Sequence, residues 1–304
     1  MDHSDLVAGL TPQERADLTR SANIPGIIRL TMHASVIIGS GWLIIERAPL
    51  WPLLMVVQGV AIIFLFTVLH ETVHRTAFKD RWVNDAVARL CGILVVLPTD
   101  WFRCFHFAHH RFTQDPEHDP ELSTAKPRTL GQYLIHLSGL PVWWSQLKTL
   151  IRNALGHDTD SFVRESEKAA VRWEARMMIA VYTFAAAVSF YAGLSEILFV
   201  WLLPVLLGQP FLRFFLLAEH GGCAYEQNML ANSRTTLTTL PFRWLTWNMS
   251  YHAEHHALPS VPFFRLPAFH QITRPHLGVV EDGYFRFHTN YLRRLIGSHH
   301  RSLG

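Results

Sequence analysis

The sequence predicts an all-α integral membrane protein, with four transmembrane helices arranged as two hairpins and a cytoplasmic helical cap that carries clustered histidines. Four apolar stretches are each close to the roughly 20 residues that an α-helix needs to cross a bilayer. Charged residues make up only 17% of the chain, below the roughly 25% that is usual in soluble domains. Histidines cluster directly after the second stretch and in the polar segments, which places polar chemistry at the membrane edge.

The four apolar stretches cover residues 27–45, 50–69, 177–194 and 197–218. Short connections join the first to the second and the third to the fourth, so each pair is expected to form a hairpin. Pro204 and Pro210 are expected to kink the fourth helix, and Arg213 is expected near its inner end. A soluble all-α protein with buried helices is the alternative, but apolar runs of this length are rare in soluble cores.

Two further apolar stretches are too short to span. Residues 86–98 are better interpreted as re-entrant or interfacial. Residues 133–147, which include Trp143 and Trp144, resemble a segment that lies in the membrane interface.

The basic residues orient the predicted helices. Of the 27 Lys and Arg, only Arg47 falls in a connection on the far side, so both termini are expected in the cytoplasm. We expect one membrane domain over residues 1–304: an N-terminal cytoplasmic segment (1–26), a hairpin (27–69), a cytoplasmic region (70–176), a hairpin (177–218) and a cytoplasmic region (219–304). The N-terminus lacks the apolar stretch of a cleavable signal peptide, so internal segments are expected to direct insertion.

Charge and cysteine content exclude two other classes of protein. A net charge of +3 is too small to indicate a nucleic-acid partner. The three cysteines form no CxxC motif and are too sparse for a disulfide framework, which is typical of a reducing compartment.

Three histidine boxes and one further histidine carry the chemistry. HETVH follows the second apolar stretch, and HFAHH and HAEHH lie in the polar regions. Residues three and four apart share one face of a helix, so each box presents its imidazoles in one direction. The candidate metal ligands are His70, His74, His106, His109, His110, His220, His252, His255 and His256.

Nine imidazoles are too many for one metal ion, since zinc sites usually take four ligands. Two ions with four or five nitrogens each fit the number. Imidazole binds iron, zinc, copper and nickel, so the ligand type alone leaves the metal open. So many imidazoles beside a membrane need a metal to satisfy them.

The boxes, their spacing and the paired apolar stretches resemble the membrane fatty acid desaturase and hydroxylase superfamily, from about residue 27 to residue 270. HETVHRTAF, FHFAHHRFTQDPEHDPEL and WNMSYHAEHHALPSVP are similar to a bacterial branch that includes dihydrorhizobitoxine desaturase-like and rhizopine oxygenase-like proteins. The resemblance implies a non-haem di-iron oxygenase that uses two Fe ions and O2 to desaturate a fatty acyl or other lipid-like alkyl chain. It also implies a bacterial inner membrane and an external electron donor, such as a ferredoxin, a rubredoxin or a cytochrome b5-like protein.

The resemblance also implies how the ligands divide. One iron would take His70, His110, His220 and His255, and the other would take His74, His106, His109, His252 and His256. Leu216 departs from the family pattern, because stearoyl-CoA desaturases have an asparagine there that binds through water. Carboxylates close to the boxes in sequence are candidates to orient the rings: Glu71, Asp115, Asp119, Glu219 and Glu254. His118 is not expected to bind metal.

Other functions share parts of this pattern. HETVH also matches the HExxH signature of zinc metalloproteases, with Glu71 as the general base, but HFAHH and HAEHH then have no role. A metal transporter would gather its ligands near the bilayer midplane, whereas these boxes follow the spans. A hydroxylase or monooxygenase of an alkyl, terpenoid or amino-acid-derived substrate stays open, because desaturation and hydroxylation begin with the same hydrogen abstraction.

An apolar substrate has to reach metals that lie just beyond the membrane. The second and fourth spans end beside His70 and His220, so the side chains that precede these histidines are candidates to line a tunnel. Ordinary helix packing or lipid contact is the alternative for each of them. The tunnel candidates are Phe64, Phe66, Thr67, Phe211, Phe214 and Phe215.

Overall fold

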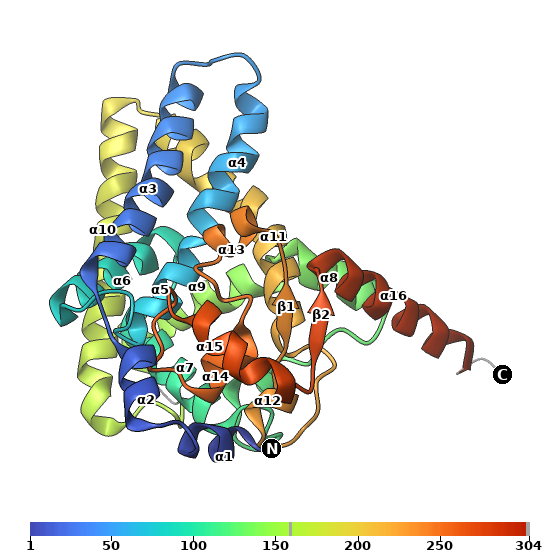
Figure 1. The fold of residues 1–304 in the computed structure, drawn as a ribbon. Coiled ribbons are helices and arrows are strands. Elements are labelled where there is room, and N and C mark those ends of the chain that lie inside the picture. The colour runs from blue at the N-terminus through green and yellow to red at the C-terminus, as the bar shows by residue number, and fades with distance from the viewer. Residues whose placement is uncertain (158–159, 302–304) are drawn as a thin grey trace.

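The computed structural model describes residues 1–157 and 160–301, which are mostly helical (Figure 1). The α-helices there are α1 (His3–Ala8), α2 (Pro12–Thr19), α3 (Asn23–Ile45), α4 (Trp51–Ile63), α5 (Leu65–Val73), α6 (Arg81–Val95), α7 (Thr99–Phe112), α8 (Leu130–Ser138), α9 (Leu140–Leu155), α10 (Glu165–Ala192), α11 (Leu203–His220), α12 (Met229–Asn232), α13 (Leu240–Leu245), α14 (His252–Ala257), α15 (Leu266–Thr273) and α16 (Tyr284–Arg301). The shorter elements are the 3-10 helices η1 (Pro120–Ser123) and η3 (Arg274–His276), the π-helix η2 (Leu198–Leu202), and the strands β1 (Thr235–Leu237) and β2 (Val280–Asp282).

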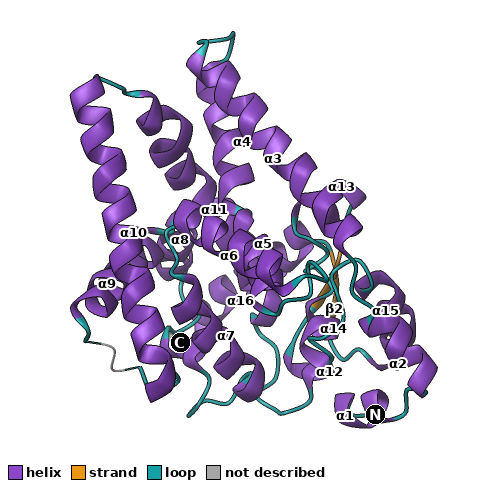
Figure 2. Ribbon diagram, turned by 90° about the vertical axis from the view of Figure 1, so that its left-hand side faces the viewer, coloured by secondary structure: helices purple, strands orange, loops and turns teal. Residues whose placement is uncertain are grey.

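Four helices in the described ranges are long and apolar enough to cross a membrane, which confirms the four predicted spans. They cover Pro12–Ile45, Trp51–Val73, Glu165–Ala192 and Leu198–His220. α3 and α4 lie side by side and are joined by a short loop at the top of Figure 1, where α10 also turns into η2. Figure 2 shows that the short helices α1, α2, α12, α14 and α15 gather at the other end.

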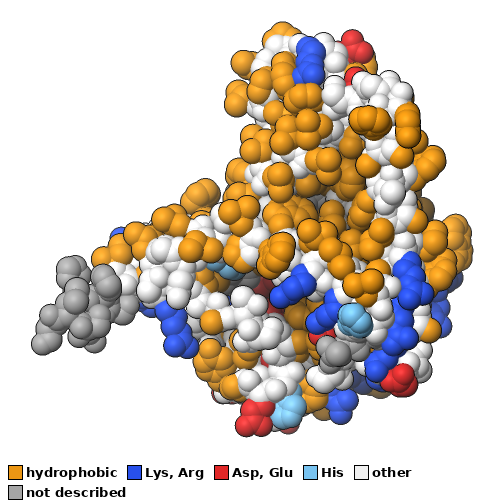
Figure 3. Space-filling view, turned by 180° about the vertical axis from the view of Figure 1, so that it is seen from behind, with side chains coloured by type: hydrophobic (Ala, Val, Ile, Leu, Met, Phe, Trp, Pro, Cys, Tyr) orange, Lys and Arg blue, Asp and Glu red, His pale blue; other side chains and the backbone are white. Residues whose placement is uncertain are grey.

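The surface has an apolar part over the long helices and a charged part at the end formed by the short helices (Figure 3). Apolar side chains cover the part formed by the long helices, whereas most charged side chains in this view surround the other end (Figure 3). Trp42, Phe184 and Leu206 are among the exposed apolar side chains of the long helices. An apolar surface of this extent matches lipid rather than water.

Two glycines let the second and fourth spans approach closely. A Cβ atom on Gly59 would lie 1.9 Å from the carbonyl oxygen of Pro204, and one on Gly208 would lie 2.2 Å from that of Gly59. Small residues at such crossings allow backbone-to-backbone packing, which drives helix association in lipid. Pro204 lies in the first turn of α11 after the π-helix η2, and Pro210 lies inside α11.

Gln58 links three of the apolar helices through hydrogen bonds. Its Oε1 accepts a hydrogen bond from Ser40 Oγ of α3 at 2.6 Å, and its Nε2 donates to the carbonyl oxygen of Val200 at 2.8 Å. Both bonds satisfy a polar side chain that would otherwise be costly among apolar neighbours. Gln58 therefore fixes the relative position of α3, α4 and η2.

The segments predicted to be re-entrant or interfacial lie in two pairs of consecutive helices, α6–α7 and α8–α9. α6 and α7 meet at an angle of 100°, and Val96 between them adopts a left-handed conformation with φ 58°. α8 and α9 leave Leu134, Trp144 and Leu147 exposed. These exposed apolar side chains match a location at the membrane interface.

The polar end contains the short two-stranded sheet. β1 pairs in parallel with β2, and Thr235 lies opposite Val280. β1 precedes α14 in the chain, and α16 projects from this end of the molecule (Figure 1). The buried Trp247 packs its ring on Phe263 at 4.6 Å, which anchors the loop that leads into α14.

Candidate metal centre

The nine predicted ligands meet where the long helices join the polar end. His70 and His74 lie at the end of α5, the histidines of HFAHH lie on α7, His220 is the last residue of α11, and HAEHH lies on α14. In the described part of the chain, their nitrogens form two groups, and within each group they lie within 4.8 Å of one another. The fold therefore brings all nine predicted residues together.

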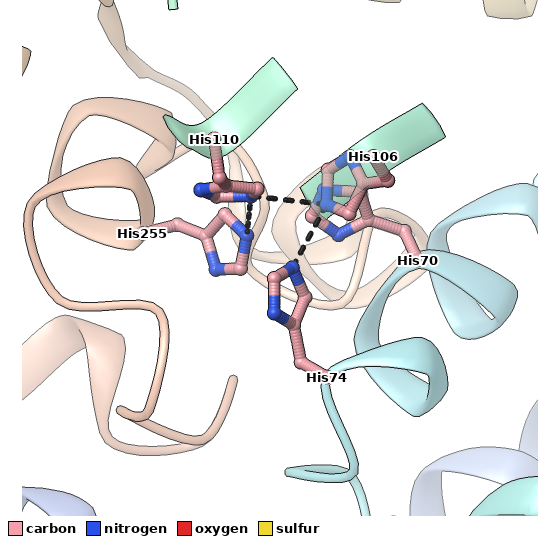
Figure 4. Close-up of side chains that lie close together, drawn as sticks. All are labelled: His70, His74, His106, His110 and His255. Carbon is pink, nitrogen blue, oxygen red and sulfur yellow. Dashed lines mark hydrogen bonds between the residues drawn. The ribbon is translucent and has the colours of Figure 1, made fainter. Parts of the chain in front are cut away.

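The first group, called the five-histidine group, contains His70, His74, His106, His110 and His255 (Figure 4). Nε2 of His106 lies 2.8 Å from Nε2 of His74 and 3.0 Å from Nε2 of His110. Nε2 of His255 lies 3.2 Å from Nε2 of His110. The ring of His70 packs against that of His106 with centroids 4.3 Å apart.

The second group, called the four-histidine group, contains His109, His220, His252 and His256, all buried. Nε2 of His220 lies 3.1 Å from Nε2 of His109 and 2.9 Å from Nε2 of His252. Nε2 of His256 is buried and has no hydrogen-bond partner among the described residues.

The hydrogen bonds around the four-histidine group leave ring nitrogens with free lone pairs that suit a metal ion. A neutral imidazole has one N–H and one lone pair. Nδ1 of His109 lies 2.9 Å from Asp119 Oδ1, and Nδ1 of His220 lies 3.2 Å from the carbonyl oxygen of Asn232. Since these oxygens accept, each neutral ring carries its proton on Nδ1, and the two facing Nε2 atoms present lone pairs that a transition-metal cation would satisfy.

The grouping corrects the division of ligands that the resemblance implied. His220 lies with His109, His252 and His256, not with His70, His110 and His255. His74 and His106 lie with the latter three instead. The reason is geometric: on α7, His106 and His110 lie one turn apart on one face, whereas His109 faces the end of α11.

Two of the five predicted carboxylates contact a histidine of the boxes. Asp119 accepts from His109 Nδ1 as described, and Glu219 Oε1 lies 3.3 Å from His252 Nδ1. Such contacts fix the tautomer and the orientation of a metal-binding ring. We propose that Asp119 and Glu219 have this role.

The other three predicted carboxylates have different partners. Glu254 accepts hydrogen bonds from His270 Nδ1 and Thr235 Oγ1, both at 2.5 Å. Glu71 accepts from the backbone N–H of Phe263 at 2.9 Å. Asp115 pairs with the exposed His118 at 3.0 Å. Glu254 and Glu71 therefore contact the elements that carry the boxes, whereas Asp115 lies on the surface.

Four residues near the centre were missed by sequence reasoning. Thr113 Oγ1 lies 3.1 Å from His256 Nδ1, and Asn232 contacts His220. Glu121 Oε2 lies 3.3 Å from His109 Nε2, and His270 contacts Glu254. The acidic DPEHDPEL stretch next to HFAHH offered a signal for Glu121, whereas nothing in the sequence connects Asn232 with His220.

Each histidine box lies close to a residue in a left-handed conformation. Arg75 (φ 60°) follows HETVH, Gln114 (φ 63°) follows HFAHH, and Trp247 and Asn248 (φ 50° and 60°) precede HAEHH. Side chains hold these turns: Asn248 Nδ2, for example, donates to the carbonyl oxygen of Phe263 at 2.9 Å. Backbone strain of this kind is typical of functional sites, where the surrounding structure maintains it.

Charged neighbours and burial set the ionisation of groups outside the spans. Burial, together with the neighbouring imidazoles, lowers the pKa of His252, His255 and His256 well below the usual value. These rings are therefore neutral near neutral pH, with lone pairs available for a metal. Burial would raise the pKa of Glu121, but Lys126 and the nearby histidines hold that pKa below its usual value.

The six tunnel candidates occupy different environments. Phe66 lies beside the five-histidine group, with its ring 6.3 Å from that of His70 and 5.4 Å from that of Phe102. Phe64 and Phe215 are buried against each other at 5.6 Å. The other three differ from these and from one another: Thr67 is buried and donates a hydrogen bond to the carbonyl oxygen of Phe64, Phe214 stacks on His288, and Phe211 is 48% exposed on the outside of α11.

Two cavities of the structure lie away from these candidates. One runs along α9 beside Trp144 and Lys148, and the other lies between α5, α6 and α7 beside Arg75 and Asp85. None of the six candidates lines either cavity. We propose that Phe66 forms the wall of the substrate site nearest to the metals, while the exposure of Phe211 favours contact with lipid.

Fold and site together define a class of helical protein with four candidate membrane spans and two histidine groups suited to metal ions at their ends. Within that class, this chain belongs to the fatty acid desaturase family, whose model matches residues 47–289. The family makes it an oxidoreductase of lipid metabolism and a membrane protein, as the sequence predicted.

Several characterised relatives are similar to this chain. An sn-1 oleoyl-lipid 12-desaturase from Picosynechococcus is 24% identical over 260 residues, which cover 78% of this chain and 73% of that protein. The dihydrorhizobitoxine desaturase of Bradyrhizobium elkanii is 26% identical over 234 residues, which cover 71% and 66%. A sphingolipid delta(4)-desaturase/C4-monooxygenase from Mus musculus is 26% identical over 212 residues, which cover 67% and 59%.

Proposed function

We propose that this protein is an O2-dependent di-iron oxidoreductase that desaturates a fatty acyl or other lipid-like alkyl chain at the cytoplasmic edge of a bacterial inner membrane. The observation that carries this proposal is the convergence of nine imidazoles into groups of five and four at the ends of the candidate spans. Imidazole ligands suit iron and leave positions open for a small molecule such as O2.

The residues of the chain prepare the site for this chemistry. When bound, the two iron ions would activate O2, the oxidant for removing hydrogen from an unactivated C–H bond. Asp119 would orient His109 by accepting a hydrogen bond from its Nδ1, and Glu219 lies 3.3 Å from Nδ1 of His252. Phe66 and Phe102 form an apolar wall beside His70 and His106, which excludes water from that side and suits an alkyl chain.

Electrons would come from a separate protein. Reduction of O2 to water during desaturation needs two electrons beyond the two that the substrate supplies. We propose a ferredoxin, a rubredoxin or a cytochrome b5-like protein as the donor.

Product analysis tests the reaction. The purified protein in lipid nanodiscs would be incubated with a reductase, a candidate electron donor, O2 and a panel of acyl lipids. We expect a product that has lost two hydrogens, detected by mass spectrometry, and no product with the His255→Ala variant. Cleavage of an added peptide in a parallel incubation, with no oxidised lipid and with zinc as the only metal, would support the metalloprotease interpretation instead.

Hydroxylation is the second candidate. The name of one similar protein, the sphingolipid delta(4)-desaturase/C4-monooxygenase, includes both desaturation and monooxygenation. Both outcomes begin with abstraction of one hydrogen, and they differ in whether a second hydrogen leaves or oxygen is transferred. Incubation under isotopically labelled O2 separates them. Desaturation leaves no label in the lipid, whereas hydroxylation adds one labelled oxygen atom.

A further inference from the structure

Glu121 is a carboxylate that the function described so far leaves without a role. Its Oε2 lies 3.3 Å from Nε2 of His109, and its Oε1 accepts a hydrogen bond from Lys126 Nζ at 2.6 Å. The Glu121 and Lys126 side chains are 35% and 22% exposed. One oxygen is therefore committed to Lys126, and the other lies against the four-histidine group.

The backbone holds Glu121 in this place. Glu121 lies in η1, and its backbone N–H donates to Asp119 Oδ1 at 2.9 Å. The same oxygen accepts from His109 Nδ1, and Asp119 Oδ2 accepts from the backbone N–H of Gln114 at 2.8 Å. Asp119 thus positions both the His109 ring and the Glu121 carboxylate.

The distance between Glu121 and His109 suits two ligands of one metal ion. Asp119 accepts the proton of His109 Nδ1, so a His109 ring that binds a metal ion through Nε2 is neutral, and Nε2 and Glu121 Oε2 then face each other as two lone-pair donors. A metal ion about 2.1 Å from two such donors sets them about 3.0 Å apart at a right angle and about 3.4 Å apart at the tetrahedral angle. The observed separation of 3.3 Å lies between these values.

We propose that Glu121 is a direct oxygen ligand of the metal ion held by His109, His220, His252 and His256. This inference rests on the proposed di-iron function and deepens it. Each metal position then has five protein donors, and the two positions differ in charge. The five-histidine position has neutral donors only, whereas the other has one anionic oxygen, which Lys126 balances and keeps from binding through both of its oxygens.

The arrangement of the remaining Nδ1 atoms supports this difference. In the four-histidine group, the Nδ1 atoms of His109, His220 and His256 lie within hydrogen-bonding distance of Asp119, Asn232 and Thr113. Nδ1 of His252 has no hydrogen-bond partner among the described residues but lies 3.3 Å from Glu219 Oε1. In the five-histidine group, the Nδ1 atoms of His70, His110 and His255 have no hydrogen-bond partner among the described residues. Among the described residues, the carboxylates of Asp119, Glu219 and Glu121 all lie against the four-histidine group.

Iron content and Mössbauer spectra of isotopically enriched protein test the proposal without relying on activity. Glu121→Gln keeps the size of the side chain, but it removes the negative charge and replaces the carboxylate oxygen with the weaker metal ligand of an amide. We expect the wild type to hold about two irons per chain. For Glu121→Gln we expect loss of one spectral component, with affinity at that position lowered at least about 10-fold. An unchanged iron content and spectrum in Glu121→Gln would overturn the proposal.

Three further variants separate ligation from charge balance and folding. Lys126→Met breaks the ion pair but keeps the carboxylate, so we expect it to retain both spectral components. The double variant Glu121→Gln/Lys126→Met is balanced in charge but lacks the ligand, so we expect it to lose the same component as Glu121→Gln. Recovery of that component in the double variant would overturn ligation in favour of charge balance. Glu117→Gln, in the same loop, is the matched control and should behave as the wild type.

The wild-type result distinguishes this proposal from the function on which it rests. A wild type that binds fewer than two irons after loading would count against the di-iron function itself. A wild type with two irons, together with an unaffected Glu121→Gln variant, would count against the role of Glu121 alone.

Discussion

One oxygen of Asp119 accepts two hydrogen bonds, from Nδ1 of His109 and from the backbone N–H of Glu121, each at 2.9 Å. This carboxylate therefore joins the orientation of a predicted metal ligand to the path of the loop that follows HFAHH. We propose that Asp119, which was predicted from its proximity to HFAHH alone, orients His109 within the four-histidine group.

Replacing Asp119 with Asn should weaken metal binding while leaving membrane insertion intact. The neutral amide is a poorer partner for the Nδ1–H of His109, so that ring loses its fixed orientation. We expect the iron affinity of one position to fall about 10–100-fold, as is typical for partners of metal ligands. Iron titration of the purified variant measures this, and Asp115→Asn, next to the exposed His118, is the control. Equal affinities in wild type and Asp119→Asn would contradict this role.

Replacing one ligand in each group should remove the two metals separately. His109→Ala alters the four-histidine group and His255→Ala the five-histidine group. Each variant should keep the iron of the other position and lose turnover, because the reaction needs both metals. Both should still insert into the membrane, since neither residue lies in one of the four spans. Measurable desaturation by either variant, assayed with the wild-type donor, would show that one position is dispensable.

The sequence predicted the helical spans closely because lipid imposes a simple rule on composition and length. The predicted stretch 50–69 corresponds to the observed span Trp51–Val73. The predicted stretch 177–194 lies in the longer span Glu165–Ala192. The prediction began too late there because hydropathy detects only the apolar part of a helix. The first turns of this helix are polar, with Glu165 and Glu167.

The site was predictable only in part. Helical spacing was enough to select the eight histidines of the boxes, and His220 was selected by its place directly after the fourth span. Their grouping depends on how α7 meets α11, and no local pattern contains that information. For the same reason, sequence analysis overlooked Asn232, which reaches His220 across 12 residues, and included Asp115, which is near HFAHH in the chain but lies on the surface.

Phe66 should control which substrates fit beside the metals. Phe66→Ala would open space next to His70, so we expect a shift in chain-length preference or in the oxidised carbon, with iron content unchanged. Each methylene in an apolar pocket contributes about 1–3 kcal/mol to selectivity. Product profiles from a mixture of acyl chains measure the shift. Phe211→Ala is the matched control on the exposed face, and identical profiles for both variants and the wild type would place the substrate elsewhere.

The short connections between spans should face away from the cytoplasm. Arg47 is the single basic residue in these connections, so the positive-inside rule places the termini in the cytoplasm. A reporter that is active only in the cytoplasm should be active when fused to the C-terminus and inactive when inserted near residue 47. The reverse pattern of activity would overturn this orientation.

The number and identity of the metal ions in the purified protein test the central claim most directly. Elemental analysis of protein that is expressed with sufficient iron, with protein concentration from amino-acid analysis, gives metals per chain. The two histidine groups predict about two irons per chain and little zinc. One zinc per chain with no iron would contradict the di-iron account.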